Sequence, residues 1–574
     1  MKAAASFPKL LLVLALAVAS AADFNALDGS VNSKADTKAP SALPPSIATA
    51  GGGHQFHLSL AGTATTNAKL VHYTLDWVTP ADTTSSQLVY GTSADALTTR
   101  VDAKLAGVVD EGSGKSVACW SAVVQNLAAG TTIYYALASD VAAGKPNSFT
   151  VPSSSSFTWA VFGDLGAPLQ KAASGVSLPA LKSALETDKA YHGVLNIGDL
   201  AYELVGPNGK NYMEELESIT SRVPMQTTVG NHEYQYGAAP DFAVQNYYRR
   251  FSGLTLGAGT LSGSSSNEFY SFNSGLIHFA FINTEVYGDE AFVALQADGK
   301  TWKVDDAARK ATGAAQANWL AYDLSRVKRA ETPYVIVCGH RPPFKTPGPL
   351  SASGNKFAKE IIPVMSKYQV DLYLAGHEHT YLHFEASTFE GYDVPPILIS
   401  GSPGNNEFVR EEADLKIKGF EWKTLIPKYG YGYLTATPES LRWQWGSAAS
   451  DGSHNPKPAM WRLEDELTFP RRPSFAASVP EGKPVNPPGE LSKVWAGSKK
   501  NGTGGGTGGG TGGGTGGSGG RDGSGDTLST PSNSNSSQSS GPTPASSASS
   551  LFACQRRLCV GSAVLLAVLS WVHL

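Results

Sequence analysis

One pattern recurs through the middle of the chain: a short apolar run ends at a glycine, and a polar or charged residue follows. The run at 194–197 leads into Gly198 and Asp199, and Tyr202 comes three positions later. A buried strand that ends in a tight turn has this signature. Because open α/β sheets place their ligands at the carboxyl ends of strands, we expect such residues to meet at one sheet edge.

Other stretches repeat the pattern. The runs at 157–162, 225–229, 334–338, 370–375 and 397–400 lead into Gly163, Gly230, Gly339, Gly376 and Gly401. All but the last supply potential ligands, which together are Asp164, Asp199, Tyr202, Asn231, His340, His377 and His379. Oxygen and imidazole donors without a thiolate suit hard or borderline metal ions. Since extended backbone would point His377 and His379 in opposite directions, we expect a bent loop there.

Each residue also has an ordinary structural interpretation. Asp164 could form a turn, Asp199 could cap a helix, and Tyr202 could be a half-buried aromatic. Asn231 could cap a helix or form a turn. His340 could be a hydrogen-bonded histidine at a strand end, and His377 and His379 could be solvent-facing loop residues. Jointly these interpretations are weak, because every set follows a glycine at a predicted strand end. Two cations about 3.5–4 Å apart need a bridging anion, and Asp199 has two oxygens for that role.

The folded part divides into two regions. Residues 54–152 hold short runs of β-formers separated by turn residues, and we expect a fibronectin type III-like β-sandwich. Residues 153–470 alternate apolar runs with helical patterns, which predicts an α/β domain. The helical patterns lie at 178–187, 241–251, 316–326 and 356–368, and an antiparallel hairpin is expected for 268–273 and 275–282.

The two ends of the chain have the composition of processing signals. Residues 1–22 combine two lysines, an apolar run and an Ala-Ser-Ala site, which predicts a signal peptide; the run is short of the roughly 20 residues that span a membrane. Residues 23–53 predict a flexible lead-in. Residues 471–550, rich in Pro, Gly, Ser and Thr, predict a linker with stalk-like O-glycosylation, and sequons begin at Asn501 and Asn535.

The last segment, 551–574, places a short spacer before an apolar tail, which predicts a GPI-anchor signal; a retained C-terminal helix is the alternative. The net charge of -4 does not indicate a nucleic-acid surface. Four cysteines are too few for a disulfide scaffold. Cys119 and Cys338 fall in the predicted folded part, and we expect two unpaired buried thiols, although the sequence leaves pairing open.

In this order, the motifs Gly-Asp-x-Gly, Gly-Asp-x-x-Tyr, Gly-Asn-His-Glu, Val-x-x-His and Gly-His-x-His resemble those of the purple acid phosphatases. The similarity covers roughly residues 56–468. It implies a metallophosphoesterase domain after the β-domain, with Fe(III) held by Asp164, Tyr202 and His379. It further implies a divalent ion (Zn, Fe or Mn) held by Asn231, His340 and His377, with Asp199 as the bridge. His232 resembles the family histidine that orients phosphate or protonates the leaving group.

Two stretches depart from the family pattern. Plant-type members often carry further histidines shortly after Val-x-x-His, where this chain has Pro349 and Leu350. The turn at 401–405 also differs from the family's Gly-Asp-Gly-Gly-Asn-like turn. These differences put a second proton donor, and a shared substrate preference, in question.

We therefore expect a secreted, surface-tethered acid phosphatase that acts on phosphate monoesters, with no nucleic-acid partner and with a GPI anchor as its membrane attachment. A phosphodiesterase or nucleotidase on the same metal frame is one alternative. A non-enzymatic surface protein that kept the fold is another. The sequence does not indicate an oligomeric state.

The tail makes a prediction of its own. Cells that express the full chain should release it on treatment with phosphatidylinositol-specific phospholipase C, because the apolar tail would have been replaced by a lipid. A chain truncated at Ser540 should be secreted into the medium. Retention after the lipase, with the tail still detected by an antibody against it, would favour a membrane helix instead.

Overall fold

The computed structural model describes residues 54–63, 69–141, 146–167, 176–187, 191–234, 240–288, 291–295, 302–343, 352–405, 422–448, 461–472 and 499–500. The predicted signal peptide, lead-in and anchor signal lie outside these residues, as do both sequons and the positions of Pro349 and Leu350. Among the helices in the described part, none is both long enough and apolar enough to cross a membrane.

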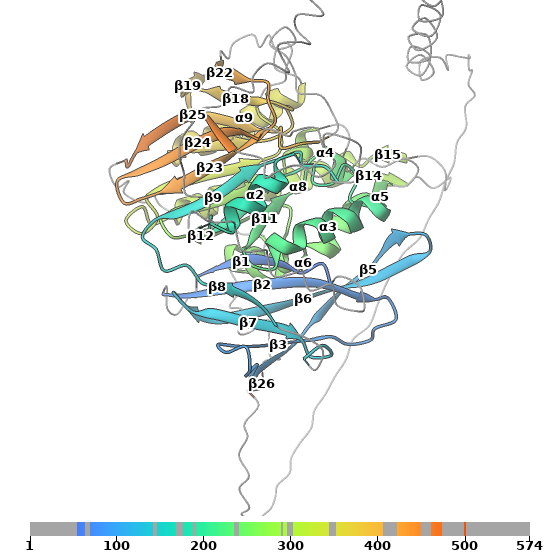
Figure 1. Cartoon of the computed structure of the whole chain (residues 1–574). Coiled ribbons are helices and arrows are strands. Elements are labelled where there is room, and N and C mark those ends of the chain that lie inside the picture. The colour runs from blue at the N-terminus through green and yellow to red at the C-terminus, as the bar shows by residue number, and fades with distance from the viewer. Residues whose placement is uncertain are drawn as a thin grey trace, which may run out of the picture. The chain divides into compact units, whose positions relative to one another are not determined.

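The N-terminal β-domain consists of two antiparallel sheets that lie as separate layers (Figure 1). One has the order β1 (His57–Thr63), β2 (Leu70–Pro80), β6 (Lys115–Ala128), β5 (Lys104–Gly112). The other has the order β26 (Lys499–Lys500), β4 (Thr99–Asp102), β3 (Gln87–Gly91), β7 (Thr132–Leu137), β8 (Asn147–Thr150). Tyr73 of the first sheet and Phe149 of the second have ring centroids 5.0 Å apart. This face-to-face packing confirms the predicted sandwich.

Strand β26 is a local correction to the sequence analysis. Lys499 and Lys500 lie in the segment predicted as linker, yet they pair with Arg100 and Thr99 of β4. Backbone hydrogen bonds to an open sheet edge need no apolar burial, so the composition of the segment does not prevent this pairing.

The second domain contains two larger mixed sheets. The six-stranded sheet runs β11 (Met225–Thr228), β10 (Gly193–Ile197), β9 (Phe157–Phe162), β23 (Gly430–Ala436), β24 (Ser440–Ala448), β25 (Trp461–Pro470). The seven-stranded sheet runs β12 (Tyr270–Ser274), β13 (Ile277–Ile282), β16 (Tyr334–Gly339), β17 (Leu372–Ala375), β21 (Ile397–Ser400), β18 (Tyr381–Phe384), β22 (Trp422–Ile426). Strands β9, β10 and β11 are parallel, as are β13, β16, β17 and β21. The α/β prediction is confirmed, and so is the antiparallel β12–β13 hairpin.

Large aromatic side chains join the two sheets. The ring of Trp159 on β9 lies 5.5 Å, centroid to centroid, from that of Phe279 on β13. Beside it, a Cβ at Gly193 would come within 2.3 Å of the Trp159 ring, so only glycine allows this close packing. The Trp159 ring therefore packs closely against both the neighbouring strand and the facing sheet.

Helices cover the outer faces of the sheets. Trp319 of α8 (Asp306–Ser325) and Phe357 of α9 (Ala352–Lys367) are buried in one core cluster with Val335 and Val337 of β16. On the other sheet, Tyr212 of α3 (Gly206–Thr220) accepts a 2.7 Å hydrogen bond from Asn196 Nδ2 on β10. Helices α2 (Leu178–Leu185) and α5 (Pro240–Arg250) also match predicted segments.

The remaining elements are short. They are α4 (Asn231–Tyr234), α6 (Ser252–Leu254), η1 (Thr255–Gly259), α7 (Thr260–Ser262), η2 (Thr284–Tyr287) and the two-stranded pairs β14 (Val293–Leu295) with β15 (Trp302–Val304) and β19 (Ser387–Phe389) with β20 (Tyr392–Val394). Cys119 and Cys338 are buried and free, as expected.

Buried polar contacts hold the β-domain against β11. Gln226 on β11 accepts a hydrogen bond from the Leu60 backbone N–H at 2.9 Å and donates to the Leu60 carbonyl at 3.0 Å. His57 Nε2 donates to the Met225 carbonyl at 3.0 Å. Because β11 leads directly into Asn231, the β-domain supports one side of the candidate site.

Candidate metal centre

The candidate ligands follow the carboxyl ends of neighbouring strands. Asp164 follows β9, Asp199 follows β10 and Asn231 follows β11. In the other sheet, His340 follows β16, and the loop after β17 carries the two remaining histidines. Each strand end thus delivers its donor to the edge where the two sheets meet, as the sequence pattern predicts.

One cluster contains Asp164, Tyr202 and His379, all buried. The Tyr202 hydroxyl lies 2.6 Å from His379 Nε2, and the same nitrogen lies 3.4 Å from Asp164 Oδ1. Within the part of the chain that is described, Asp164 Oδ1 is fully buried with no hydrogen-bond partner. A buried carboxylate oxygen without a hydrogen bond is costly unless a cation binds it, so this cluster fits a metal ion.

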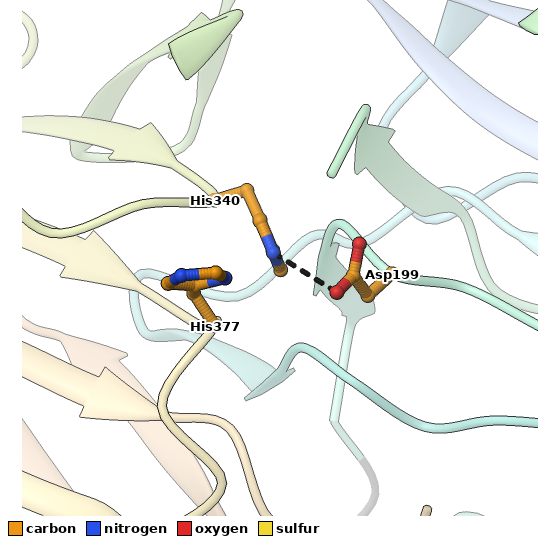
Figure 2. A group of neighbouring side chains, drawn as sticks. All are labelled: Asp199, His340 and His377. Atoms are coloured by element: carbon orange, nitrogen blue, oxygen red, sulfur yellow. Dashed lines mark ion pairs between the residues drawn. The ribbon is translucent and has the colours of Figure 1, made fainter. Parts of the chain in front are cut away.

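A second cluster contains Asp199, His340 and His377, whose ligand atoms lie within 4.8 Å of one another (Figure 2). His340 Nε2 lies 3.1 Å from Asp199 Oδ2 and 3.2 Å from Asn231 Oδ1. The other ring nitrogen, Nδ1, lies 2.9 Å from the Ile197 carbonyl and donates to it. If the His340 ring is neutral, Nε2 carries a lone pair, and it faces the acceptor oxygens of Asp199 and Asn231. Three acceptor atoms this close together are favourable only when they share a cation, which is either a proton or a metal ion.

One backbone hydrogen bond connects the two clusters, and another holds Asp199 within the second cluster. The His377 backbone N–H donates to Asp164 Oδ2 at 2.8 Å, and the His232 backbone N–H donates to Asp199 Oδ1 at 2.8 Å. The contacts group Asp164 with Tyr202 and His379, and they place Asp199, the predicted bridge, with the second group of Asn231, His340 and His377. Their roles as ligands stay predictions.

Strained backbone shapes the ligand turns. Asp164, Asp199, Tyr202 and His377 have φ of 60°, 50°, 51° and 70°. Left-handed backbone costs about 1–2 kcal/mol for a residue with a Cβ. Such residues persist where the surrounding structure holds them, often at functional sites. At His377 this conformation bends the loop.

The charges of the second cluster are strongly coupled. Burial alone would raise the pKa of Asp199, but the charge and hydrogen bond of His340 outweigh it and hold that pKa below its ordinary value. Burial alone would lower the pKa of His340, but Asp199 and Asp164 raise it to about 10. Burial, with the neighbouring Arg341 guanidinium, lowers the pKa of His377 well below its ordinary value. The site thus keeps anionic oxygens and a neutral imidazole together, which are the donor forms that metal ions bind.

The sequence analysis assigned no role to Glu233, which the structure places beneath two of the ligand turns. This buried carboxylate accepts hydrogen bonds from the backbone N–H groups of Gly230 at 2.8 Å, and of Asp199 and Leu200 at 2.9 Å each. Burial and the nearby Asp199 charge raise the pKa of Glu233 to about 7. Its place in Gly-Asn-His-Glu is the signal that could have found it.

Two further residues border the site. Arg341 Nε donates to both carboxylate oxygens of Glu285 at 2.9 and 2.8 Å, and its Nη1 lies 3.1 Å from His377 Nε2. Asn405 Nδ2 donates to the Asp164 carbonyl at 2.9 Å, so the turn that departs from the family pattern still supports a ligand.

The candidate catalytic histidine lies beside both clusters. The ring of His232 packs against Tyr202 at a centroid distance of 4.4 Å, and its Nδ1 lies 3.2 Å from Glu203 Oε1. Burial would lower the pKa of His232, but the hydrogen bond to Glu203 and the Asp199 charge raise it to about 9. Glu203 was not among the residues predicted from sequence.

Two family models match the chain. The model described as "Purple acid Phosphatase, N-terminal domain" matches residues 54–158, and "Calcineurin-like phosphoesterase" matches residues 157–381. The first coincides with the sandwich, and the second contains all seven candidate ligands.

Curated relatives match at moderate identity. "Acid phosphatase type 7" from Danio rerio is 31% identical over 48% of this chain and 61% of its own length. "Probable inactive purple acid phosphatase 9" from Arabidopsis thaliana is 29% identical over 46% of this chain and 42% of its own length. The chain thus spans about half the length of these relatives. The solved purple acid phosphatase PPD1 from seeds of yellow lupin (Lupinus luteus) aligns with a TM-score of 0.49 at 16% identity, covering 73% of this chain and 74% of that chain.

The bridging prediction for Asp199 can be tested by metal analysis. Asp199 lies within 3.1 Å of His340 and is hydrogen-bonded through its other oxygen, so Asp199→Ala should lower the content of both metal ions. Mass spectrometry on the purified wild type and variant measures this stoichiometry. A variant that kept both ions at wild-type levels would contradict the bridging role. Glu214→Ala, at a half-exposed position of helix α3 where Glu214 pairs with Lys210, is the control.

Proposed function

This chain belongs to the purple acid phosphatases, and from that premise we propose that it hydrolyses phosphate monoesters at a dinuclear metal centre. The observation that carries the proposal is the division of the buried donors into two clusters, joined by the hydrogen bond from the His377 backbone N–H to Asp164. A lone structural ion would not need two such groups of donors.

The residues present fit the two ions. We propose Fe(III) at Asp164, Tyr202 and His379, where charged oxygen donors favour a trivalent ion. A divalent ion, Zn, Fe or Mn, would be held by Asn231, His340 and His377, with Asp199 shared between the ions. When bound, the ions supply positive charge that neutralises phosphate oxygens and favours attack by water on phosphorus.

The protein's own residues have separate tasks in this proposal. Glu233 holds the backbone of the Gly230 and Asp199 turns, so that the ligands keep their positions. His232, tied through its backbone to Asp199, places an imidazole next to the clusters. It would orient the phosphate or give a proton to the leaving group. Because the two ions would supply the positive charge that phosphate needs, no Gly-rich phosphate loop is required.

We also propose that the protein is secreted and held at the cell surface by a GPI anchor. The proposal is supported by the composition of residues 1–22 and 551–574, which lie outside the described residues.

The substrate class is tested by comparing two esters. The purified protein should hydrolyse p-nitrophenyl phosphate at acid pH and act much more slowly on bis(p-nitrophenyl) phosphate. Faster hydrolysis of the diester would favour a phosphodiesterase on the same frame. No hydrolysis of either ester by protein carrying both metals would favour a non-enzymatic surface protein.

The proposed iron site is tested by colour. Fe(III) would keep Tyr202 deprotonated far below the free phenol pKa of roughly 10. The family resemblance implies that an Fe(III)–phenolate pair absorbs visible light. Aerobically purified protein should therefore be coloured, and Tyr202→Phe should be colourless at equal protein concentration. A colourless, fully active wild type without iron would contradict the Fe(III) assignment and leave the two-metal proposal standing.

A further inference from the structure

Arg341 directly follows a predicted ligand, His340, and the function proposed above gives it no task. Its Nη1 lies 3.1 Å from His377 Nε2. Among the described residues, it is the one Arg or Lys side chain that contacts a predicted ligand. Because a guanidinium keeps its charge throughout the pH range in which proteins are folded, this positive charge is a fixed feature of the site.

Contacts on both sides of the backbone fix the position of Arg341. Its N–H donates to Thr284 Oγ1 at 2.9 Å, and its carbonyl accepts a hydrogen bond from the Tyr373 hydroxyl at 2.8 Å. Thr284 lies in η2, and Tyr373 lies in β17, the strand that leads to His377. The side chain of Arg341 therefore starts from a point that two separate elements hold in place.

Glu285 anchors the guanidinium. Nε of Arg341 donates to both of its carboxylate oxygens, at 2.9 and 2.8 Å. The Glu285 side chain is 0% exposed, whereas that of Arg341 is 20% exposed. The anchor is thus enclosed by protein, and Nη1 is the part of the guanidinium that reaches the second cluster. On this ground alone the contact could be an ordinary buried ion pair, which is weak evidence of a function.

The charge beside His377 indicates more than a structural pair. His377 is a predicted ligand of the divalent ion, so an ion held there would be next to the guanidinium. Two positive charges this close repel each other strongly in a partly buried site. The arrangement becomes favourable when an anion lies between them, because the anion then binds both. The site therefore combines a fixed positive charge with a place for an anionic oxygen.

We propose that Arg341 is a substrate-binding residue whose guanidinium binds an oxygen of the transferred phosphate on the His377 side of the centre. The inference rests on the proposed function. A planar guanidinium presents its N–H donors in a fixed fork that matches phosphate oxygens. Arg341 exchanges its contact with His377 for one with phosphate, while Glu285 keeps its hold on Nε. No covalent bond to Arg341 forms or breaks.

Phosphate binding tests this role without turnover. Inorganic phosphate is titrated into the metal-loaded protein in a calorimeter, for the wild type, Arg341→Gln and Arg341→Lys. Arg341→Gln should weaken binding about tenfold or more, because a hydrogen bond between charged groups is lost. Arg341→Lys keeps the charge without the fork and should recover part of the affinity. Wild-type affinity in Arg341→Gln would overturn the proposal.

Metal retention separates substrate binding from support of the ligand His377. During dialysis against a chelator without phosphate, Arg341→Gln should keep both ions at least as long as the wild type, because a repelling charge has been removed. Mass spectrometry of samples taken during the dialysis measures this. Faster loss of the divalent ion from the variant would assign Arg341 to support of His377 and overturn the proposal.

Steady-state kinetics on p-nitrophenyl phosphate provide a third measurement. A contact that phosphate makes before and during the reaction contributes to ground-state binding, so Arg341→Gln should raise KM more than it lowers kcat. A fall in kcat at unchanged KM would contradict the assignment.

The matched control is Arg442→Gln. Arg442 on β24 also pairs with a glutamate, through Nε at 3.0 Å and Nη2 at 2.7 Å to Glu466, and in the described structure it contacts no predicted ligand. It should leave phosphate affinity, metal retention and both kinetic constants unchanged. A wild type that hydrolyses no ester, yet binds phosphate in a way that depends on Arg341, would contradict the proposed function and leave the phosphate contact of Arg341 standing.

Discussion

Two buried carboxylates, Asp164 and Asp199, set the constraint on which the site depends. An ionised carboxylate removed from water is destabilising by several kcal/mol unless its oxygens are paired with donors or cations. Three of the four oxygens are accounted for by His340 and by the backbone N–H groups of His377 and His232. Asp164 Oδ1, buried without a hydrogen-bond partner in the described chain, is left for a cation. The same burial that makes these groups costly makes them strong metal donors.

The rest of the molecule keeps these donors in place. The ligand turns are loops, but Glu233 binds two of them through backbone N–H groups, and Asn405 binds the Asp164 turn. Gln226 extends this support to the β-domain by pairing with the Leu60 backbone. Left-handed backbone at several ligands is tolerated because these buried contacts hold it. The β-domain is thus more than a spacer, since it packs directly on the strand that leads to Asn231.

The differences between expectation and structure have physical causes. Buried parallel strands appear in a sequence as continuous apolar runs, and all six predicted runs form strands. Helix α3 (Gly206–Thr220) was missed because its first turns are polar and contain glycine and proline. Helix α8 starts ten residues before its predicted boundary, where Asp305 accepts hydrogen bonds from the backbone N–H groups of Ala307 and Ala308. Its first half is rich in small residues and shows no apolar periodicity.

The sequence by itself determined the donor types, their order and their place after strands, because a metal centre needs particular atoms and a buried strand needs an apolar run. Only the tertiary structure decided which donors share a cluster, because sheet register and packing bring together residues that lie far apart in the chain. It also decided that His340 donates from Nδ1 to Ile197, leaving Nε2 for the site. The contact between Glu203 and His232 was also decided by the tertiary structure. The left-handed backbone of Glu203 and the neighbouring turn that carries His232 create this contact, and no local pattern in the chain encodes these two features.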